Sequence, residues 1–445
     1  MTEGQSAPFR KQREALTLLI GFSATALIGL IATHVLDSSQ AGLISAAAFA
    51  AVISAAMVIS WGAEAGQFFI SQGLAVALIA LLQVMPEFMV EAVIAWHGEV
   101  RNMFANATGS NRLLIGLGWP LIYFTADISH RLKYGRSVGS IQLRRENIVE
   151  VTSLLVASSF YLKMLAFGSL TMTDGVVLCG MYLAYMYILS RLPEEESENK
   201  DDLLAAARYI VELPSPRTSK TILLGLFLIG GGVMAFVAEP FVESLKHVAT
   251  SWGIREFVFI QWVAPFLSEF PEKVTAFYWS RTIRLAPLAL LNMISSTVSQ
   301  FTLLVGMIPL VYAASYWMGH FPSVHKDIFG LPLVPMMEEG PMAHDIRVEV
   351  FLSWAMTLLG CAMLAKLRFT WGNAVIIFAI WILQFVSGPI EQMTGVHQHI
   401  QHFGLGVACI ALALFEVVRW WKEIEVRAAL RETIALMRGT AHRTA

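Results

Sequence analysis

The chain has 445 residues, of which 56% are hydrophobic and 14% are charged, with a formal net charge of -2 and a mean hydropathy of +0.61. An ordinary soluble protein carries about a quarter of its residues as charges, so the composition excludes that class and indicates a polytopic membrane protein. The cysteines Cys179, Cys361 and Cys409 stand far apart in apolar stretches, which indicates packing and not a disulfide framework or a metal site.

The first apolar run, residues 15–35, follows the basic residues Arg10, Lys11 and Arg13. About twenty apolar residues are enough to span a bilayer. A secretory signal also joins basic residues to an apolar run, but a small-residue cleavage site should then follow, and none is clear here. We therefore expect residues 1–40 to form a cytoplasmic N-terminus and one extra transmembrane helix.

Two further membrane helices are expected at 41–66 and 70–97, and the second contains Pro86-Glu87. Proline lacks an amide hydrogen and clashes with the carbonyl four residues earlier, so Pro86 should free a backbone oxygen beside the glutamate. Carboxylate and carbonyl oxygens suit sodium or calcium. A glutamate within a membrane is costly, and by default it marks a functional site.

The next helix, expected at 104–126, opens with Asn106-Ala-Thr108-Gly109-Ser110-Asn111. Small hydroxyl residues also mediate ordinary helix packing in membranes, so this stretch alone is weak evidence for a site. Arg112 follows directly and is expected at the outer mouth, where it could modulate entry; the favoured alternative is structural anchoring. Helices at 149–169 and 174–191 complete the first half of the chain.

A segment at 192–219 separates the halves, and its acidic run and Pro-Ser-Pro sequence predict a cytoplasmic linker with a short amphipathic helix. A long outer loop is expected at 317–348. Six apolar segments form the second half, and we expect membrane helices at 220–243, 254–280, 286–316, 349–367, 371–390 and 402–421.

The second half repeats the polar pattern of the first. Pro271-Glu272 lies in one apolar segment, and Asn292 with Ser295-Ser296-Thr297 lies in the next. Glu272 follows Glu87 by 185 positions and Asn292 follows Asn106 by 186, so the spacing repeats to within one residue. Discontinuous helices at matching positions are typical of inverted-repeat transporters. One such site is often only a kinked helix, whereas two in register favour a cation transporter.

The basic residues test the count of twelve helices. With the N-terminus in the cytoplasm, the inner segments carry 23 of the lysines and arginines and the outer segments carry five. Cytoplasmic loops are enriched in these residues. The distribution predicts twelve spans with both termini in the cytoplasm of a bacterial-type inner (plasma) membrane.

The pattern resembles the two α-repeats of the calcium/cation antiporter superfamily, which includes the sodium/calcium exchangers. Those repeats read roughly G-T-S-x-P-E on one helix and G-N-x-x-G-S-N on the next. The resemblance covers roughly residues 41–191 and 220–390. It implies an all-α polytopic protein of about twelve transmembrane helices, in two inverted five-helix repeats with one extra helix at each end. The last of these, with a cytoplasmic tail, would occupy residues 391–445.

The resemblance also implies a cation site. Glu87 and Glu272 would be the central ligands near the membrane midplane, with further oxygen ligands one turn before each glutamate and on the following helix. The implied site contains Glu87, Glu272, Gln83, Ser268, Ser110, Ser296, Asn106, Asn292, Glu269 and Glu91.

Both halves depart from the family pattern. Val84 and Glu269 replace the motif serine of the two halves, and Glu91, Glu269 and Lys273 are additional ionisable groups. These groups favour proton coupling or an altered stoichiometry. The alternative is that they form structural ion pairs.

These observations predict a secondary active antiporter that exchanges calcium or a similar cation for sodium or protons. Its expected partners are inorganic cations (Ca²⁺, Na⁺, H⁺) and the lipid bilayer; no resident cofactor, nucleic acid, protein partner or enzymatic activity is expected. Two alternatives stay open: a sodium/proton exchanger that uses the same site, and a non-transporting family member that acts as a sensor or scaffold. No His-Glu-x-x-His motif supports an intramembrane hydrolase.

Overall fold

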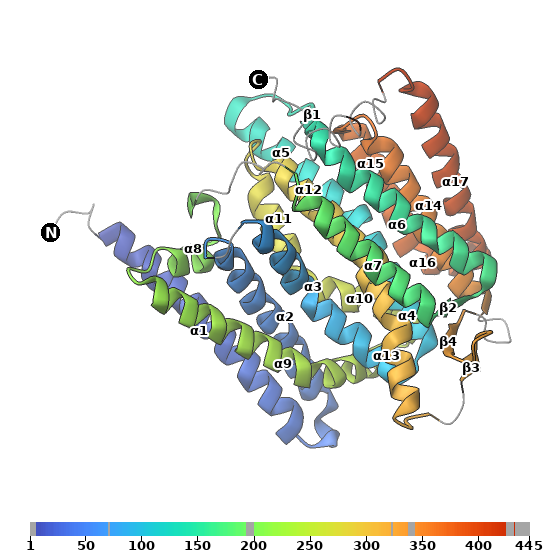
Figure 1. Cartoon of the computed structure of the whole chain (residues 1–445), viewed down its shortest axis with the longest axis horizontal. Coiled ribbons are helices and arrows are strands. Elements are labelled where there is room, and N and C mark those ends of the chain that lie inside the picture. Colours follow the sequence, from blue (N-terminus) through green and yellow to red (C-terminus); the bar gives the residue numbers. More distant parts are fainter. Residues whose placement is uncertain are drawn as a thin grey trace. The chain divides into compact units, whose positions relative to one another are not determined.

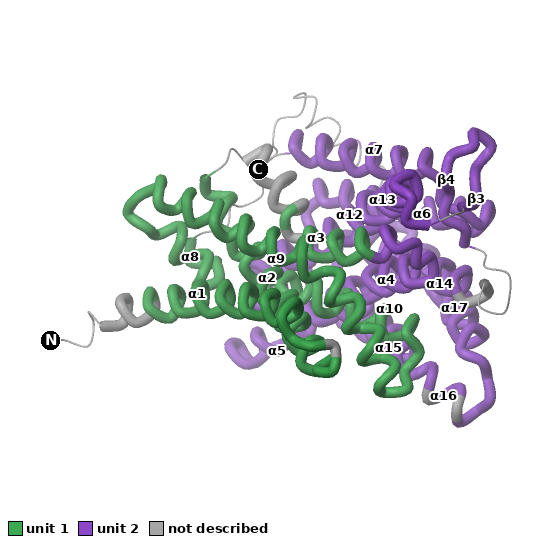
Figure 2. The backbone as a smooth tube through the Cα atoms, turned by 90° about the horizontal axis from the view of Figure 1, so that it is seen from below, with its two compact units in different colours: residues 1–93, 194–275 green, residues 94–193, 276–445 purple. Residues whose placement is uncertain are grey.

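The computed structural model describes residues 6–69, 72–192, 200–321, 324–336, 343–423 and 431, and it is almost entirely helical (Figure 1). The chain forms two compact units (Figure 2). The first contains residues 1–93 and 194–275, and the second contains residues 94–193 and 276–445. Each unit therefore combines segments from both halves of the sequence.

The first unit is built around α2 and α9, which pack along each other and against α1. Its core includes Trp61 of α2, Leu226 of α9 and Ile210 of the short helix α8. Its helices are α1 (Ser6–Val35), α2 (Ala41–Gly66), α3 (Gln72–Trp96), α8 (Ala205–Val211), α9 (Pro216–Ser251), α10 (Glu256–Ser268) and α11 (Phe270–Ser280), of which the last residues of α3 and α11 are counted with the second unit.

In the second unit α14 packs between α4, α6 and α17, and α6, α14 and α17 run side by side in Figure 1. Two π-helical turns, η2 (Leu114–Gly118) and η5 (Gln300–Leu304), join α4 to α5 and α12 to α13. The helices are α4 (Val100–Leu113), α5 (Trp119–Tyr134), α6 (Ile148–Phe167), α7 (Met172–Leu189), α12 (Ala286–Ser299), α13 (Val305–Trp317), α14 (Ala343–Leu364), α15 (Trp371–Phe385), α16 (Ser387–Thr394) and α17 (Gln398–Arg419).

Short antiparallel strands join loops of the second unit. β1 (Ser140–Gln142) pairs with β5 (Arg368–Thr370), and both lie in segments that the charge distribution places inside. β4 (Pro332–Pro335) pairs with β2 (Ser169–Thr171) and β3 (His325–Lys326), and all three lie in segments predicted to be outside. Each pairing thus joins segments that the predicted topology assigns to one side of the membrane.

All twelve predicted segments fall on helices. Two of them are interrupted: the segment at 254–280 is divided between α10 and α11, and the segment at 371–390 between α15 and α16. Among the described residues, eight helices are long and apolar enough to cross a membrane. The twelve-span topology stays a prediction.

The two halves share irregular backbone features within the second unit. The π-helical turns η2 and η5 begin 186 residues apart, which is also the spacing between Asn106 and Asn292. Both α7 and α15 follow a short strand and begin with a threonine capping box. Each strand is preceded by a residue with positive φ, Gly168 (65°) in one half and Leu367 (53°) in the other. The two halves of the sequence therefore share local backbone features at matching spacings, and their arrangement as inverted repeats stays a prediction.

Helices α7 and α13 approach closely at a pair of glycines. A Cβ atom at Gly175 would lie 2.5 Å from the backbone oxygen of Gly306. Because that obstacle is backbone, we expect Gly175→Ala to reduce the free energy of unfolding by about 1–3 kcal/mol through overpacking.

The matched control is Gly180→Ala on the same helix, since a Cβ at Gly180 meets nothing within 4 Å. Alanine is the better helix former, so this control should melt at or slightly above the wild-type temperature. Thermal melts of the purified proteins in detergent check both variants. Equal melting temperatures for the two variants would contradict the close packing of α7 on α13.

Candidate cation-binding site

Buried carboxylates gather in the first unit. The exposed fractions are 1% for Glu87 and 0% for Glu91 on α3, 3% for Glu272 on α11, and 2% for Glu64 on α2. Burying an ionised carboxylate is costly unless it is paired, hydrogen-bonded or bound to a cation. These side chains therefore have the chemistry of a cation or proton site.

The two prolines affect their helices differently. Pro86 lies inside α3, which runs from Gln72 to Trp96 without interruption. The prediction that both Pro-Glu helices are discontinuous is therefore wrong for the first half. The side chain of Gln83, predicted to be a ligand one turn before Glu87, lies outside the described set.

In the second half the helix does break. α10 ends at Ser268 and α11 begins at Phe270, so Pro271 lies in the first turn, where proline is well tolerated. Glu272 also lies in this first turn. Negative charge is favoured there because helix N-termini carry unsatisfied N–H groups and a partial positive charge. The Ser268 hydroxyl donates to the carbonyl of Ala264 on its own helix, at 3.0 Å.

Glu269 and Lys273 form a buried ion pair. Lys273 Nζ lies 2.6 Å from Glu269 Oε2, and the two side chains are 6% and 2% exposed. The pair favours the structural alternative for these two residues. It also means that the lysine next to Glu272 already has a carboxylate partner.

A contact that the sequence did not reveal joins α2 to the second Pro-Glu helix. The Thr275 hydroxyl donates to Glu64 Oε1 at 2.7 Å, and both residues are buried. Thr275 lies three residues after Glu272 on α11. The signal for Glu64 was its position in the apolar segment 41–66, where a carboxylate is as costly as Glu87.

The amide and hydroxyl candidates lie in the second unit. Asn106 and Ser110 on α4 are fully buried, Ser296 on α12 is 7% exposed, and Asn292 is half-buried. Each set lies on the helix that leads directly into a π-helical turn. π-helical turns occur frequently at functional sites.

Tyrosines hold both of these helices. Asn111 Nδ2 donates to Tyr161 Oη on α6 at 3.1 Å. In the second repeat, Ser295 Oγ and Tyr185 Oη on α7 share a hydrogen bond of 2.8 Å. These contacts restrict the rotation of α4 and α12, whose other residues are candidate ligands.

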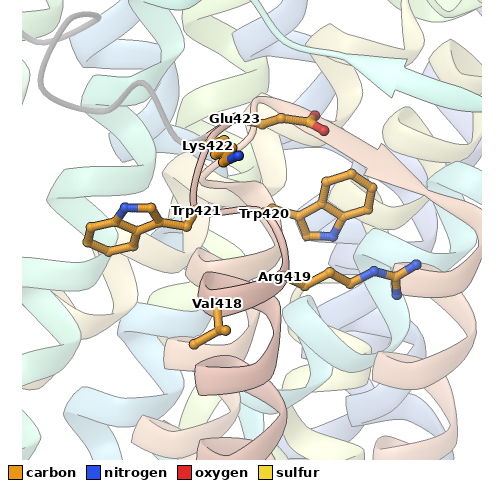
Figure 3. Close-up of a pocket in the computed structure, with 6 residues that line it drawn as sticks. All are labelled: Val418, Arg419, Trp420, Trp421, Lys422 and Glu423. Atoms are coloured by element: carbon orange, nitrogen blue, oxygen red, sulfur yellow. The ribbon is translucent and has the colours of Figure 1, made fainter.

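The candidate cation ligands therefore form two chemical groups, carboxylates in one unit and amides and hydroxyls in the other. Glu87, Glu91 and Glu272 belong to the first unit, and the asparagines and serines of α4 and α12 belong to the second. Within the part of the chain that the structure describes, no three His, Cys, Asp or Glu side chains converge on a metal position. A hollow at the end of α17, lined by residues 418–423, contains none of the predicted ligands (Figure 3).

A model of the family described as "Sodium/calcium exchanger protein" matches residues 38–191 and 222–387. The chain belongs to this family. The matched segments together cover more than half of the chain. Members of the sodium/calcium exchanger family are transporters. The long apolar helices of this chain agree with its membership.

Solved structures show the same family resemblance. The crystal structure of an H⁺/Ca²⁺ exchanger, CAX, is 28% identical with a TM-score of 0.81, and the match covers 96% of this chain and 99% of that one. The Ca²⁺/H⁺ antiporter protein YfkE is 14% identical with a TM-score of 0.54, over 88% and 99% of the two chains, and shows the fold alone. No curated protein sequence matches this family member.

Proposed function

We propose that the chain is a secondary active antiporter that exchanges calcium for protons, with Glu87 and Glu272 as the central cation ligands. The observation that carries this proposal is the burial of these two carboxylates, 1% and 3% exposed, at matching Pro-Glu positions of an exchanger-family chain. We propose protons and not sodium as the coupling ion because the solved structure with 28% identity is that of an H⁺/Ca²⁺ exchanger.

The chemistry of exchange follows from the cost of buried charge. An ionised carboxylate at this depth is stabilised by a bound cation or loses its charge by binding a proton. Two carboxylates match the charge of one calcium ion, and the same groups bind protons when calcium leaves. Because the empty ionised state is unfavourable, the site binds one substrate or the other, which is the requirement for antiport.

A second candidate function uses sodium as the coupling ion. It is favoured by the buried amide and hydroxyl groups of Asn106, Ser110 and Ser296. Neutral oxygens of this kind supply additional ligands for a hard cation without adding charge.

Uptake of labelled calcium into proteoliposomes separates these candidates. Under our proposal, an acidic interior drives calcium uptake in sodium-free buffer, and a sodium gradient at equal pH does not. Uptake driven only by sodium would replace protons with sodium as the coupling ion. Absence of calcium uptake under both gradients would contradict calcium antiport, and the non-transporting sensor or scaffold would then be the better hypothesis.

A further inference from the structure

A buried ion-pair network in the second unit joins the first-repeat motif to α17. Arg112 Nη2 lies 2.5 Å from Glu349 Oε2 on α14, and His402 Nδ1 on α17 lies 2.5 Å from Glu349 Oε1. Arg112 and His402 are fully buried, and Glu349 is 5% exposed. This buried ion pair supports the expected structural anchoring by Arg112, and its place relative to the outer mouth stays a prediction.

The network continues beyond His402. His402 Nε2 lies 3.0 Å from Ser387 Oγ, at the start of α16, and Gln398 Nε2 donates to the same hydroxyl at 2.7 Å. At the other end, Arg112 Nη1 donates to Gln384 Oε1 on α15 at 3.1 Å. The polar contacts thus connect α4 with α14, α15, α16 and α17.

Arg112 is itself a residue of α4, the helix that carries the candidate ligands Asn106 and Ser110. Its Nε donates to the carbonyl of Thr108 at 3.1 Å, and Thr108 lies between Asn106 and Ser110. The Ser353 hydroxyl of α14 donates to the same carbonyl at 3.2 Å. The π-helical turn η2 begins two residues after Arg112. Because Arg112 belongs to α4, its contacts with Glu349 and Gln384, together with the Ser353 hydrogen bond, restrain the rotation of α4 just before its backbone becomes irregular.

We propose that Arg112 and His402 are positioning residues, through which α17 holds Asn106 and Ser110 in the orientation that binds a cation. A buried ion pair is best attested as a device that fixes register, and groups that orient ligands commonly tune affinity 10–100-fold. The effect on cation affinity rests on the proposed function. The restraint on the rotation of α4 does not depend on the proposed function.

The test compares His402→Ala with the conservative His402→Gln, which keeps a neutral donor for Glu349. Lys163→Gln is the matched control, because it breaks a different ion pair of the same unit, between Lys163 on α6 and Asp174 on α7. Two quantities are measured: the calcium concentration that gives half-maximal uptake, and hydrogen–deuterium exchange of residues 100–113. Ser387→Ala supplies a milder break if His402→Ala does not fold.

His402→Ala is expected to raise the half-saturating calcium concentration about tenfold, with maximal uptake per folded protein unchanged and faster exchange in α4. In His402→Gln, the half-saturating calcium concentration and the exchange rate of α4 should both stay close to the wild-type values. Lys163→Gln should leave both quantities unchanged. Unchanged α4 exchange in His402→Ala would overturn the proposal, and so would faster exchange without a change in half-saturation. A failure of the proposed function is distinguishable, because the wild type would then take up no calcium, or uptake would persist in Glu87→Gln, whereas the restraint on α4 is measured by hydrogen–deuterium exchange alone.

Discussion

Glu87→Gln and Glu272→Gln are each expected to abolish calcium uptake. Glutamine keeps the shape and one oxygen of the side chain but removes the negative charge, so calcium in the site is left with uncompensated charge. Leaving a buried charge unpaired costs about 3–5 kcal/mol, which corresponds to a loss of affinity of at least about hundredfold. The amide also cannot bind the exchanged proton, so the exchange itself should stop.

The measurement is the initial rate of labelled calcium uptake at several calcium concentrations. Glu243→Gln on α9 is the control, because Glu243 is an exposed carboxylate that pairs with Lys246 at 2.8 Å. It should transport at the wild-type rate. If both substitutions of the buried glutamates leave uptake intact, these residues are not the central ligands. If only one does, the two repeats contribute unequally to the site.

Lys273→Met is expected to destabilise the fold strongly. It leaves Glu269 buried without its ion-pair partner, at a cost of about 3–5 kcal/mol. Replacing both members, as Glu269→Gln with Lys273→Met, removes both charges, and such double replacements are often neutral or stabilising. The double variant should therefore melt well above the single one. Tryptophan-fluorescence melts in detergent measure the melting temperatures of the two variants and show which one is higher.

The same pair of variants tests the role of the ion pair in transport. If the pair is purely structural, the folded double variant should take up calcium with the wild-type half-saturating concentration. Loss of uptake in a folded double variant would contradict this and return Glu269 to the set of ligands. Equal melting temperatures for the single and double variants would show that the 2.6 Å contact contributes little to stability.

The helices were predictable because length and hydropathy decide whether a segment can be buried as a helix. The segment 41–66 matches α2, and the matching sites 185 and 186 residues apart could be found by counting. The effect of proline was less predictable. A proline removes one hydrogen bond wherever it occurs, but packing decides whether the helix continues, as at Pro86, or restarts, as at Pro271.

The candidate site was predictable in residue type but not in partners. The cost of an intramembrane carboxylate singled out Glu87 and Glu272 without any structure. The partner of Arg112 lies 237 positions away at Glu349, and Thr275 contacts Glu64 across 211 positions. No local pattern specifies such distant contacts, because they depend on how the helices pack. The division into two units is unpredictable for the same reason.

The π-helical turns η2 and η5 occur at matching positions in the two halves of the sequence. Their sequences, Leu-Ile-Gly-Leu-Gly and Gln-Phe-Thr-Leu-Leu, share little, yet they begin 186 positions apart. Aligning the halves on these turns pairs Ser110 with Ser296 and Asn111 with Thr297. The irregular backbone therefore marks matching positions in the two halves where the side chains differ. Searches for ancient gene duplication in other membrane proteins can use such backbone landmarks where sequence identity between the copies has been lost.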